Sequence, residues 1–476
     1  MNAASNERAG DAGDAIARSA SGEEATAAHA ALLLARIADR TARIGVVGQG
    51  YVGLPLAVAL AEQGFPVLGI DVSEARVATI NTGRSPIGDV SDARLSALVA
   101  AGRFRATTDA QGAADCDVRF VCVPTPFDRN KTPDLTYVHA AADGIAATLR
   151  PGQLVVLQST TYPGTTDEAV RPRLEQGGLA AGRDFFLAFV PERIDPGDPE
   201  HTVETTPKVV GGMTAHCTAV TTAVLATLGA TVMAVSSPRV AELTKLLENV
   251  FRAVNIALVN ELAVLCEQMG IDVWEVIGAA ATKPFGFMPF WPGPGVGGHC
   301  IPVDPWYLSW KAREYDFPTR FIELAAEVNQ RMPAHVVDLV VGALSGDGKP
   351  LAGADVLVIG VAFKPNVADP RLAPAERVIA LLLAGGARVR YHDPHIARFR
   401  VGGDVFLPEP TTLDSEPLTD DGLAAADTVV LLVAHRAVDI GRITRHARLV
   451  VDACNATAGH VGGARVVRLG APAPGP

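Results

Sequence analysis

The stretch "RIGVVGQGYVGLPLAVALAEQGFPVLGID", residues 43–71, decides the fold. An apolar run is followed by a glycine-rich turn, an apolar stretch of helical length and a second apolar run that ends at Asp71. This order predicts strand, turn, helix and strand, which is a βαβ unit. Similar strand patterns with helix-like intervals follow at 117–126, 153–164 and 185–197. Such alternation predicts a parallel, doubly wound α/β sheet.

Residues 237–270 break this alternation with one long predicted helix. Ser237 is placed to cap it, Pro238 takes the first helical position and Gly270 ends it. Its apolar residues run nearly all round the helix: Leu243, Leu246, Leu247, Val250, Phe251, Val254, Leu258, Leu262 and Leu265. A helix that is apolar on most faces must be covered on most faces, so we expect it between domains or at a subunit contact.

A second α/β block begins with "GADVLVIGVAFKPNVADPR" at residue 353, and strand patterns follow at 387–394, 426–435 and 447–457. The predicted fold is therefore α/β, with two Rossmann-like doubly wound domains joined by a long central helix. We place a Rossmann-like domain at 41–235, a central helical domain at 236–334 and a second α/β domain at 335–476. In such proteins a site in the cleft between the two halves is the default expectation.

Residues 1–40 are rich in Ala, Ser, Gly and charged residues, and we predict a disordered N-terminal arm. Within it, "EEATAAHAALLLARIADR" at 23–40 is compatible with a short helix, but a mobile tail is the favoured interpretation.

The composition indicates a globular protein, with 48% hydrophobic and 20% charged residues. The formal net charge of −11 argues against nucleic acid or an anionic membrane as the main partner. The N-terminus does not resemble a signal peptide, and no apolar run approaches the length needed to span a bilayer. Six cysteines without Cys-x-x-Cys spacing predict neither a disulfide framework nor a metal site, which favours a reducing cytoplasm.

The glycine turn has the pattern of a dinucleotide-binding loop. Gly48, Gly50 and Gly53, with Tyr51 and Val52 between them, follow a strand and open a helix, and an acidic residue ends the next strand. This context predicts that a pyrophosphate binds at the helix N-terminus. Asp71 would accept hydrogen bonds from the adenosine ribose and repel a 2′-phosphate, which favours NAD over NADP. Arg76 keeps NADP open as an alternative.

A cysteine lies in an irregular segment, "WPGPGVGGHCIPVDPWYL", residues 291–308. Glycine and proline break helices and strands, so Cys300 does not fill the core of either. Beside a nicotinamide cofactor, a thiolate can add to an aldehyde, and the hemithioacetal can lose a hydride to form a thioester. The alternative, a small buried apolar residue, fits the other five cysteines better than Cys300.

Polar residues near this cysteine and on the long helix are candidates for proton handling. Lys245 and Asn249 are four residues apart on one helix face and could stabilise an oxyanion, or they could form a solvated edge or a bridging hydrogen bond. Asp304 either caps the helix that follows it or works with Lys245 in removing a proton through water. His299 adjoins Cys300, but a structural role is favoured.

The chain resembles the UDP-sugar 6-dehydrogenases from Arg43 to about Thr457. The resemblance is carried by "GQGYVGLP", "CVPTP", "QSTTYPGTT", "FVPERIDPG", "AELTKLLENVFRAVNIALVNE", "KPFGFMPFWPGPGVGGHCIPVDPWYL" and "GVAFKPNVADPR". Within the family, the cysteine segment and "LSWKAREYDFPTRFIELAAEVN" look most like the UDP-N-acetylglucosamine 6-dehydrogenases. UDP-glucose and UDP-N-acetylmannosamine enzymes are the alternatives.

The resemblance implies a role for each matching residue. It makes Cys300 the nucleophile, Lys245 and Asn249 the oxyanion and proton-handling pair, and Asp304 the partner of the lysine. Glu192 would serve thioester hydrolysis, and Thr160 would order water. It implies NAD contacts for Thr125, Thr160 and Arg371 beside the glycine turn, and UDP-sugar contacts for Glu192, Arg193, Lys245, Asn249, Phe285, Gly297 and Lys364. It also implies a UDP-sugar-binding role for 335–476. The long apolar helix at 237–270 predicts a homodimer or larger homo-oligomer.

Two positions depart from the family pattern. Leu372 lies in "DPRLAP", where the family continues differently, and Cys454 stands where the family usually has an arginine that holds the substrate. These departures keep a non-catalytic nucleotide-sugar or NAD binding protein open as a rival function. A β-hydroxyacid dehydrogenase, which makes one oxidation without a cysteine, is the nearest enzymatic rival.

Overall fold

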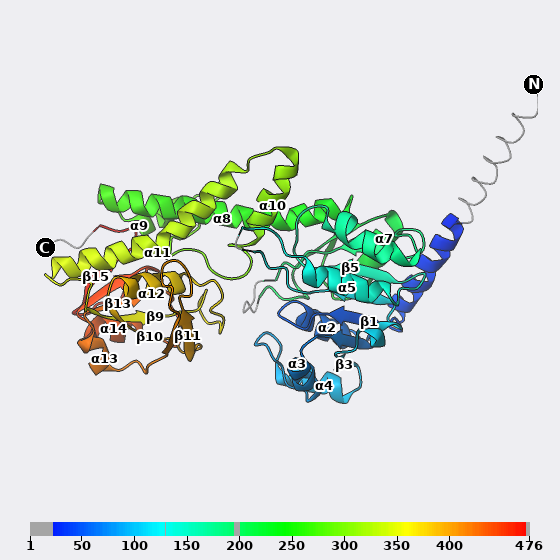
Figure 1. The fold of residues 1–476 in the computed structure, drawn as a ribbon, viewed down its shortest axis with the longest axis horizontal. Coiled ribbons are helices and arrows are strands. Elements are labelled where there is room, and N and C mark those ends of the chain that lie inside the picture. The colour runs from blue at the N-terminus through cyan, green and yellow to red at the C-terminus, as the bar shows by residue number, and fades with distance from the viewer. Residues whose placement is uncertain (1–21, 129, 195–199, 473–476) are drawn as a thin grey trace, which may run out of the picture. The chain divides into compact units, whose positions relative to one another are not determined.

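A computed structural model of the chain describes residues 22–128, 130–194 and 200–472. The chain divides into two compact units, Met1–Leu247 and Glu248–Pro476, and each has its own sheet, which can be followed separately in Figure 1. The boundary between the units falls inside the long helix α8 (Pro238–Met269). The finer domain boundaries given above stay predictions.

The first unit is built on an eight-stranded sheet with the order β3-β2-β1-β4-β5-β6-β7-β8. All neighbouring strands are parallel except β6 and β7. Its first six strands have the order of a Rossmann fold, as predicted. The strands are β1 (Ile44–Val47), β2 (Val67–Ile70), β3 (Phe104–Thr107), β4 (Val118–Val121), β5 (Leu154–Leu157), β6 (Phe186–Phe189), β7 (Lys208–Gly212) and β8 (Val232–Val235).

The helices of this unit connect the parallel strands. The central crossover helix, α2, is buried at eight of its ten positions, which explains why its sequence is apolar rather than amphipathic. The others are α3 (Glu74–Asn81), α4 (Asp92–Ala100), α5 (Thr136–Ala146), α6 (Arg171–Leu174) and α7 (Ala215–Ala226), and α2 itself is Gly53–Glu62. Short helical turns lie at η1 (Ala110–Ala113), η2 (Thr166–Val170) and η3 (Glu175–Gly177).

The N-terminal arm differs from the prediction of disorder. Residues 22–38 form a helix, and residues 1–21 lie outside the described part of the chain. Ala30, Leu33 and Ile37 are buried in the core of the first unit. Their spacing of three and four residues puts them on one helix face. This docking supplies the stability that the isolated segment lacks, because a helix of this length is marginal in water.

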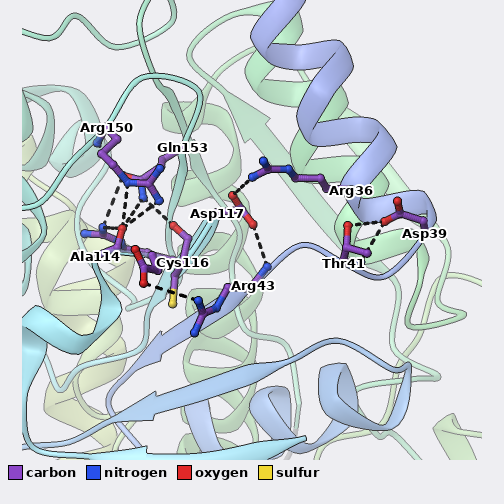
Figure 2. Close-up of polar contacts among 11 residues, drawn as sticks. Arg36, Asp39, Thr41, Arg43, Ala114, Cys116, Asp117, Arg150 and Gln153 are labelled. Atoms are coloured by element: carbon purple, nitrogen blue, oxygen red, sulfur yellow. Dashed lines mark hydrogen bonds and ion pairs between the residues drawn. The ribbon is translucent and has the colours of Figure 1, made fainter.

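Polar contacts fasten the end of this helix to the amino ends of β1 and β4 (Figure 2). Arg36 donates from Nη1 to Oδ1 of the buried Asp117 over 2.6 Å. The other carboxylate oxygen of Asp117 accepts the backbone N–H of Arg43 at 2.9 Å. Asp39 accepts from the backbone N–H and the hydroxyl of Thr41 in the turn between them. The helix is therefore an integral part of the first unit.

Replacing Leu33 by alanine is expected to destabilise the first unit by about 2–5 kcal/mol, because it leaves a cavity at a position that is 3% exposed. Thermal and denaturant unfolding measure the loss. Leu32→Ala is the matched control, since Leu32 is 55% exposed on the same helix and its loss should cost under about 0.5 kcal/mol. Equal effects of the two substitutions would show that the helix does not dock in solution.

The second unit contains a five-stranded parallel sheet with the order β10-β9-β13-β14-β15 and a separate antiparallel pair, β11 and β12. The strands are β9 (Asp355–Ile359), β10 (Arg388–His392), β11 (Arg398–Val401), β12 (Thr411–Asp414), β13 (Thr428–Leu431), β14 (Leu449–Asp452) and β15 (Arg465–Arg468). Its helices are α9 (Val273–Ala280), α10 (Asp304–Ala312), α11 (Arg320–Gly346), α12 (Pro374–Ala384), α13 (Asp420–Ala425) and α14 (Ile440–His446), with a turn at η4 (Arg313–Tyr315). The predicted second α/β block is thus confirmed.

Both predicted ends of α8 are confirmed. The Ser237 hydroxyl accepts the N–H of Val240, Pro238 is the first helical residue, and Gly270 follows the helix with a φ of +70°. By length and apolar composition α8 could also cross a bilayer, so the expectation that no segment reaches that length was wrong. Core helices of soluble proteins meet the same criterion, so the length and composition of α8 do not show whether it crosses a membrane.

Candidate active site

Predicted cofactor residues of the first unit, and the predicted catalytic residue Glu192, follow the carboxyl ends of parallel strands. The glycine turn follows β1, Asp71 follows β2, Thr125 lies beyond β4, Thr160 beyond β5 and Glu192 beyond β6. Parallel strands end at the same edge of a sheet, so the topology gathers these residues at one edge. In open α/β sheets this edge is where ligands bind.

The glycine turn has a shape that only glycine allows at its two ends. Gly48 has a φ of +92°, and a Cβ there would lie 2.4 Å from the carbonyl oxygen of Cys122. A Cβ on Gly53 would lie 1.8 Å from the carbonyl oxygen of Gly48. Around Gly50, by contrast, a Cβ would meet nothing within 4 Å. The turn thus packs tightly on the strand while leaving open space beside the N-terminus of α2, which fits a pyrophosphate.

Three donors hold the carboxylate of Asp71, the predicted ribose ligand. Its carboxylate accepts the backbone N–H groups of Gln49 and Ser73 at 2.9 Å each, and Arg76 pairs with it at 2.9 Å. Burial alone would raise the pKa of Asp71, but the two backbone donors and Arg76 outweigh it and lower the pKa. The side chain is therefore anionic at neutral pH, as repulsion of a 2′-phosphate requires.

Asp71→Asn is expected to raise the KM for NAD about tenfold, because a charge-assisted hydrogen bond to the ribose is lost. The ratio of kcat/KM for NAD over NADP should fall at the same time. Steady-state kinetics with both cofactors measure the two effects. An unchanged ratio would show that Asp71 does not face the ribose.

Glu192 is buried in a polar network that the sequence did not reveal. Its carboxylate accepts from Gln158 Nε2 at 2.7 Å and from the backbone N–H groups of Arg193 and Ile194 at 2.7 and 3.0 Å. The ammonium of Lys208, whose side chain is 1% exposed, lies 3.6 Å away. The hydroxyl of Thr125 donates to the carbonyl of Thr160, and Arg193 donates to the carbonyl of Pro207. Glu192 is thus fixed in place rather than lying in a surface loop.

In the second unit Cys300 leads directly into α10. Its carbonyl accepts the N–H groups of Val303 and Asp304 at 3.0 and 2.8 Å, which closes the turn before the helix. Asp304 is the first residue of α10, Val303 takes the N-cap position, and no side-chain cap bond forms there. The interpretation of Asp304 as a helix cap was therefore wrong.

The carboxylate of Asp304 instead accepts Asn249 Nδ2 at 2.5 Å. Asn249 is completely buried and Asp304 is 3% exposed, which excludes a solvated helix edge for this part of α8. Arg252, which the sequence analysis missed, donates to the amide oxygen of Asn249. Lys245 lies one helical turn before Asn249 and is buried as well. The amide is thus oriented from both sides, as a fixed hydrogen-bond donor should be.

Lys364 lines a pocket of about 230 Å³ in the second unit, together with Phe363, Pro374, Leu432 and Cys454 among other residues. Burial, followed by the charge of Asp452, raises the pKa of the Cys454 thiol. Where the family usually has a cation, this pocket therefore presents a neutral side chain.

The segment before Cys300 packs on the loop that carries Lys364. Gly298 donates its N–H to the carbonyl of Arg371 at 3.1 Å, and a Cβ on Gly297 or Gly298 would lie 2.9 Å from Phe363. The guanidinium of Arg371 itself pairs with Asp369 at 2.6 Å. Phe285 is 71% exposed, with the ammonium of Lys283 over its ring. The structure thus brings Gly297 and Gly298, which directly precede His299 and Cys300, against the loop that carries Lys364 within one unit.

Three family models match the chain in sequence. They are the NAD binding, central and UDP binding domains of the UDP-glucose/GDP-mannose dehydrogenase family, and they cover residues 42–229, 239–331 and 357–459. The chain belongs to this family. It is an NAD-dependent UDP-sugar dehydrogenase, an oxidoreductase with a small-molecule substrate. The recognised resemblance, the fold class and the cofactor are confirmed, and the two rival functions are disfavoured.

Individual relatives agree with this placement. UDP-N-acetyl-D-glucosamine 6-dehydrogenase of Pseudomonas aeruginosa is 37% identical over 401 residues, 83% of this chain and 90% of its own length. UDP-N-acetyl-D-mannosamine dehydrogenase of Salmonella typhi is 36% identical over 435 residues, 86% of this chain and 97% of its own. The solved UDP-N-acetylmannosamine dehydrogenase of Pyrococcus horikoshii matches with a TM-score of 0.80 and 30% identity, covering 90% of this chain and 99% of that one.

Proposed function

We propose that this dehydrogenase oxidises the C6 alcohol of a UDP-sugar to the carboxylate through a thioester at Cys300. The observation that carries the proposal is the buried hydrogen bond from Asn249 of α8 to Asp304, because Asp304 is the first residue of the helix that Cys300 leads into. A thiol in an irregular segment, four residues before a carboxylate that a fixed amide donor holds, is suited to covalent chemistry at a carbonyl.

The proposed sequence has two oxidations and one hydrolysis. In the first, the alcohol proton leaves through water held by Lys245 and Asp304, and C6 becomes an aldehyde. The thiolate of Cys300 adds to C6, and the resulting alkoxide, stabilised by Lys245 and Asn249, takes a proton to give a thiohemiacetal. Loss of a hydride and a proton from this adduct gives the thioester. Water ordered by Thr160 and activated by Glu192 cleaves the C–S bond and releases the carboxylate and the thiol.

NAD, when bound at the edge of the first sheet, accepts the hydride removed in each oxidation. For its binding we propose the glycine turn with Gly48, Gly50, Tyr51, Val52 and Gly53, the pair Asp71 and Arg76, and Thr125, Thr160 and Arg371. For the UDP-sugar we propose Glu192, Arg193, Lys245, Asn249, Phe285, Gly297 and Lys364.

UDP-N-acetylglucosamine is the proposed sugar substrate. The segment around Cys300 and the similarity to the Pseudomonas aeruginosa enzyme support it. UDP-glucose and UDP-N-acetylmannosamine are the alternatives, and relatives named for N-acetylmannosamine are of nearly equal similarity. These sugars differ at C2, away from the reacting C6, so the catalytic residues do not discriminate among them.

A panel of UDP-sugars, assayed by NADH absorbance, tests this function. The highest kcat/KM is expected for UDP-N-acetylglucosamine, with the N-acetylglucosaminuronic acid product identified by mass spectrometry. A higher value for another UDP-sugar would reassign the substrate and leave the reaction intact. No NADH with any UDP-sugar would overturn the proposed reaction.

We further propose a homodimer or larger homo-oligomer in the cytoplasm, acting in surface polysaccharide synthesis. Exposed apolar residues along α8, among them Leu243, Leu247, Leu258 and Leu262, support an assembly that covers this helix. The net charge of −11 supports the absence of a nucleic-acid or membrane partner.

A further inference from the structure

A histidine and an aspartate form a buried pair in the second unit, outside the residues assigned above. His435 lies beyond the end of β13 and Asp393 follows β10. Their side chains are both 0% exposed, and His435 Nε2 lies 3.1 Å from Asp393 Oδ2. A buried polar pair of this kind is retained only when its partners are satisfied, so its further contacts show what it holds.

Asp393 forms hydrogen bonds to the start of the loop at residues 360–373, which carries Lys364. Its Oδ2 accepts the backbone N–H groups of Val361 at 2.8 Å and Ala362 at 3.2 Å. Its Oδ1 accepts those of His395 and Ile396 at 2.8 and 3.0 Å. Burial alone would raise the pKa of Asp393, but these donors and His435 outweigh it and bring the pKa to about 2.

His435 accepts a hydrogen bond from the same loop, two residues beyond Lys364. Its Nδ1 lies 3.0 Å from the backbone nitrogen of Asn366, whose N–H can only donate. Nδ1 is therefore unprotonated, and the proton on Nε2 donates to Asp393. Asn366 has a φ of +63°, a strained backbone conformation, and its side chain accepts the N–H of Arg436 at 2.8 Å. The hydrogen bonds on both sides hold this strained turn in place.

Between the contacts of Asp393 and His435, the loop lines a pocket and supports the cysteine segment. Phe363 and Lys364 line the pocket, and Phe363 also supports Gly297 and Gly298 just before Cys300. A shift of the loop would therefore move the wall of the pocket and the support of the cysteine segment together.

Each of the two larger sheets has an aspartate after the second strand of its βαβ unit, and the two aspartates have different partners. Asp71 and Asp393 each follow the second strand of a βαβ unit and each bind the backbone of the preceding turn. The further partner of Asp71 is Arg76, whose side chain is 42% exposed, whereas that of Asp393 is the fully buried His435. Asp393 is thus closed to a ribose, and its role is to hold the loop.

We propose that His435, oriented by Asp393, is a positioning residue that fixes the Lys364 loop for UDP-sugar binding. This inference rests on the proposed function for the identity of the ligand. It assigns distinct tasks to the two ring nitrogens, since Nδ1 holds the loop and Nε2 satisfies the buried carboxylate.

Two substitutions separate these tasks. In His435→Gln the amide nitrogen replaces Nε2 and still reaches Asp393, but the bond to Asn366 is lost. In His435→Asn the amide oxygen replaces Nδ1 and still accepts from Asn366, but Asp393 loses its side-chain donor. His435→Gln is expected to raise the Kd for UDP and the KM for the UDP-sugar about tenfold, the KM for NAD staying unchanged. For His435→Asn the Kd for UDP should stay within about threefold of the parent value. Its melting temperature should fall further than that of His435→Gln.

Calorimetric titration with UDP and thermal unfolding measure these quantities. The positioning role would be overturned if the variant with the lower melting temperature were also the one that binds UDP more weakly. It would also be overturned if His435→Gln bound UDP like the parent. If either variant does not fold, Asn366→Ala tests whether UDP binding depends on how firmly this turn is held, because it keeps the backbone N–H that His435 accepts and loosens the turn from its exposed side. It removes the acceptor for Arg436 and should weaken UDP binding in the same direction, whereas unchanged binding would overturn the role.

Measurements on the parent protein distinguish a failure of the positioning role from a failure of the proposed reaction. A parent that binds UDP and oxidises a UDP-sugar, with unaffected variants, overturns only the positioning role. A parent that binds UDP but oxidises no sugar overturns the reaction and leaves the comparison of UDP affinities in force. A parent with no measurable UDP binding overturns both.

Discussion

Replacing Cys300 by serine is expected to lower steady-state NADH formation by at least about a thousandfold. A serine alkoxide is hard to generate near neutral pH, so the aldehyde is not trapped, or an ester forms and is hydrolysed slowly. A rapid first phase of about one NADH per active site should remain, because the first oxidation does not need the sulfur. Stopped-flow absorbance separates this first phase from the steady state.

The same substitution at Cys266 is the control for this experiment. Cys266 is a buried thiol on α8, where serine can bond to the preceding helical turn. Its replacement should leave the rapid phase and the steady state close to those of the parent. Steady-state turnover of Cys300→Ser at the parent rate would remove the cysteine from the mechanism.

Asn249→Ala is expected to lower kcat about a hundredfold, with a smaller change in KM. The amide that lies between Asp304 and Arg252 would be lost, and one oxyanion donor is worth ~3 kcal/mol in the transition state. The buried carboxylate of Asp304 would also lose its donor, which adds a loss of stability of about 1–3 kcal/mol. Steady-state kinetics and thermal unfolding report the two effects separately.

Asn255→Ala on the same helix is the matched control, because Asn255 bonds only to the carbonyl of Phe251 in its own helix among the contacts of the described residues. It should change kcat by less than about twofold. A kcat for Asn249→Ala equal to that of the control would show that the amide is a structural contact and not an oxyanion donor.

Much of the fold was predictable because local patterns and tertiary packing agree. Apolar runs of strand length with a glycine turn and an apolar helix between them have few alternatives, and the observed order of β1, α2 and β2 matches them. Ser237, Pro238 and Gly270 set the ends of α8 through local hydrogen bonding and backbone conformation. Such signals act over a few residues and survive in any tertiary context.

The misjudged elements depend on contacts that a local pattern does not contain. The helix at 22–38 is alanine-rich and short, and its burial of Leu33 and Ile37 against the first sheet is what stabilises it. Asp304 precedes a proline, as a cap would, but its carboxylate turns to Asn249, 55 residues earlier. His435 and Asp393 are 42 residues apart, and neither is part of a recognisable motif.

The candidate site was predictable where the type of a residue and its local sequence pattern together indicate its chemistry. The glycine turn and Asp71 follow from the dinucleotide pattern, and Cys300 follows from its irregular segment. Glu192 followed only from the family resemblance, because its burial depends on Gln158 and Lys208, which lie on other strands or just after them. Arg252 was missed because a charged residue on a long helix is usually solvated.

The ratio of NADH formed to UDP-sugar consumed tests the central claim most directly. With limiting UDP-sugar, excess NAD and reaction to completion, the thioester route predicts two NADH for each sugar, with uronic acid as the sole sugar product. A ratio of one, with the aldehyde released, would contradict it.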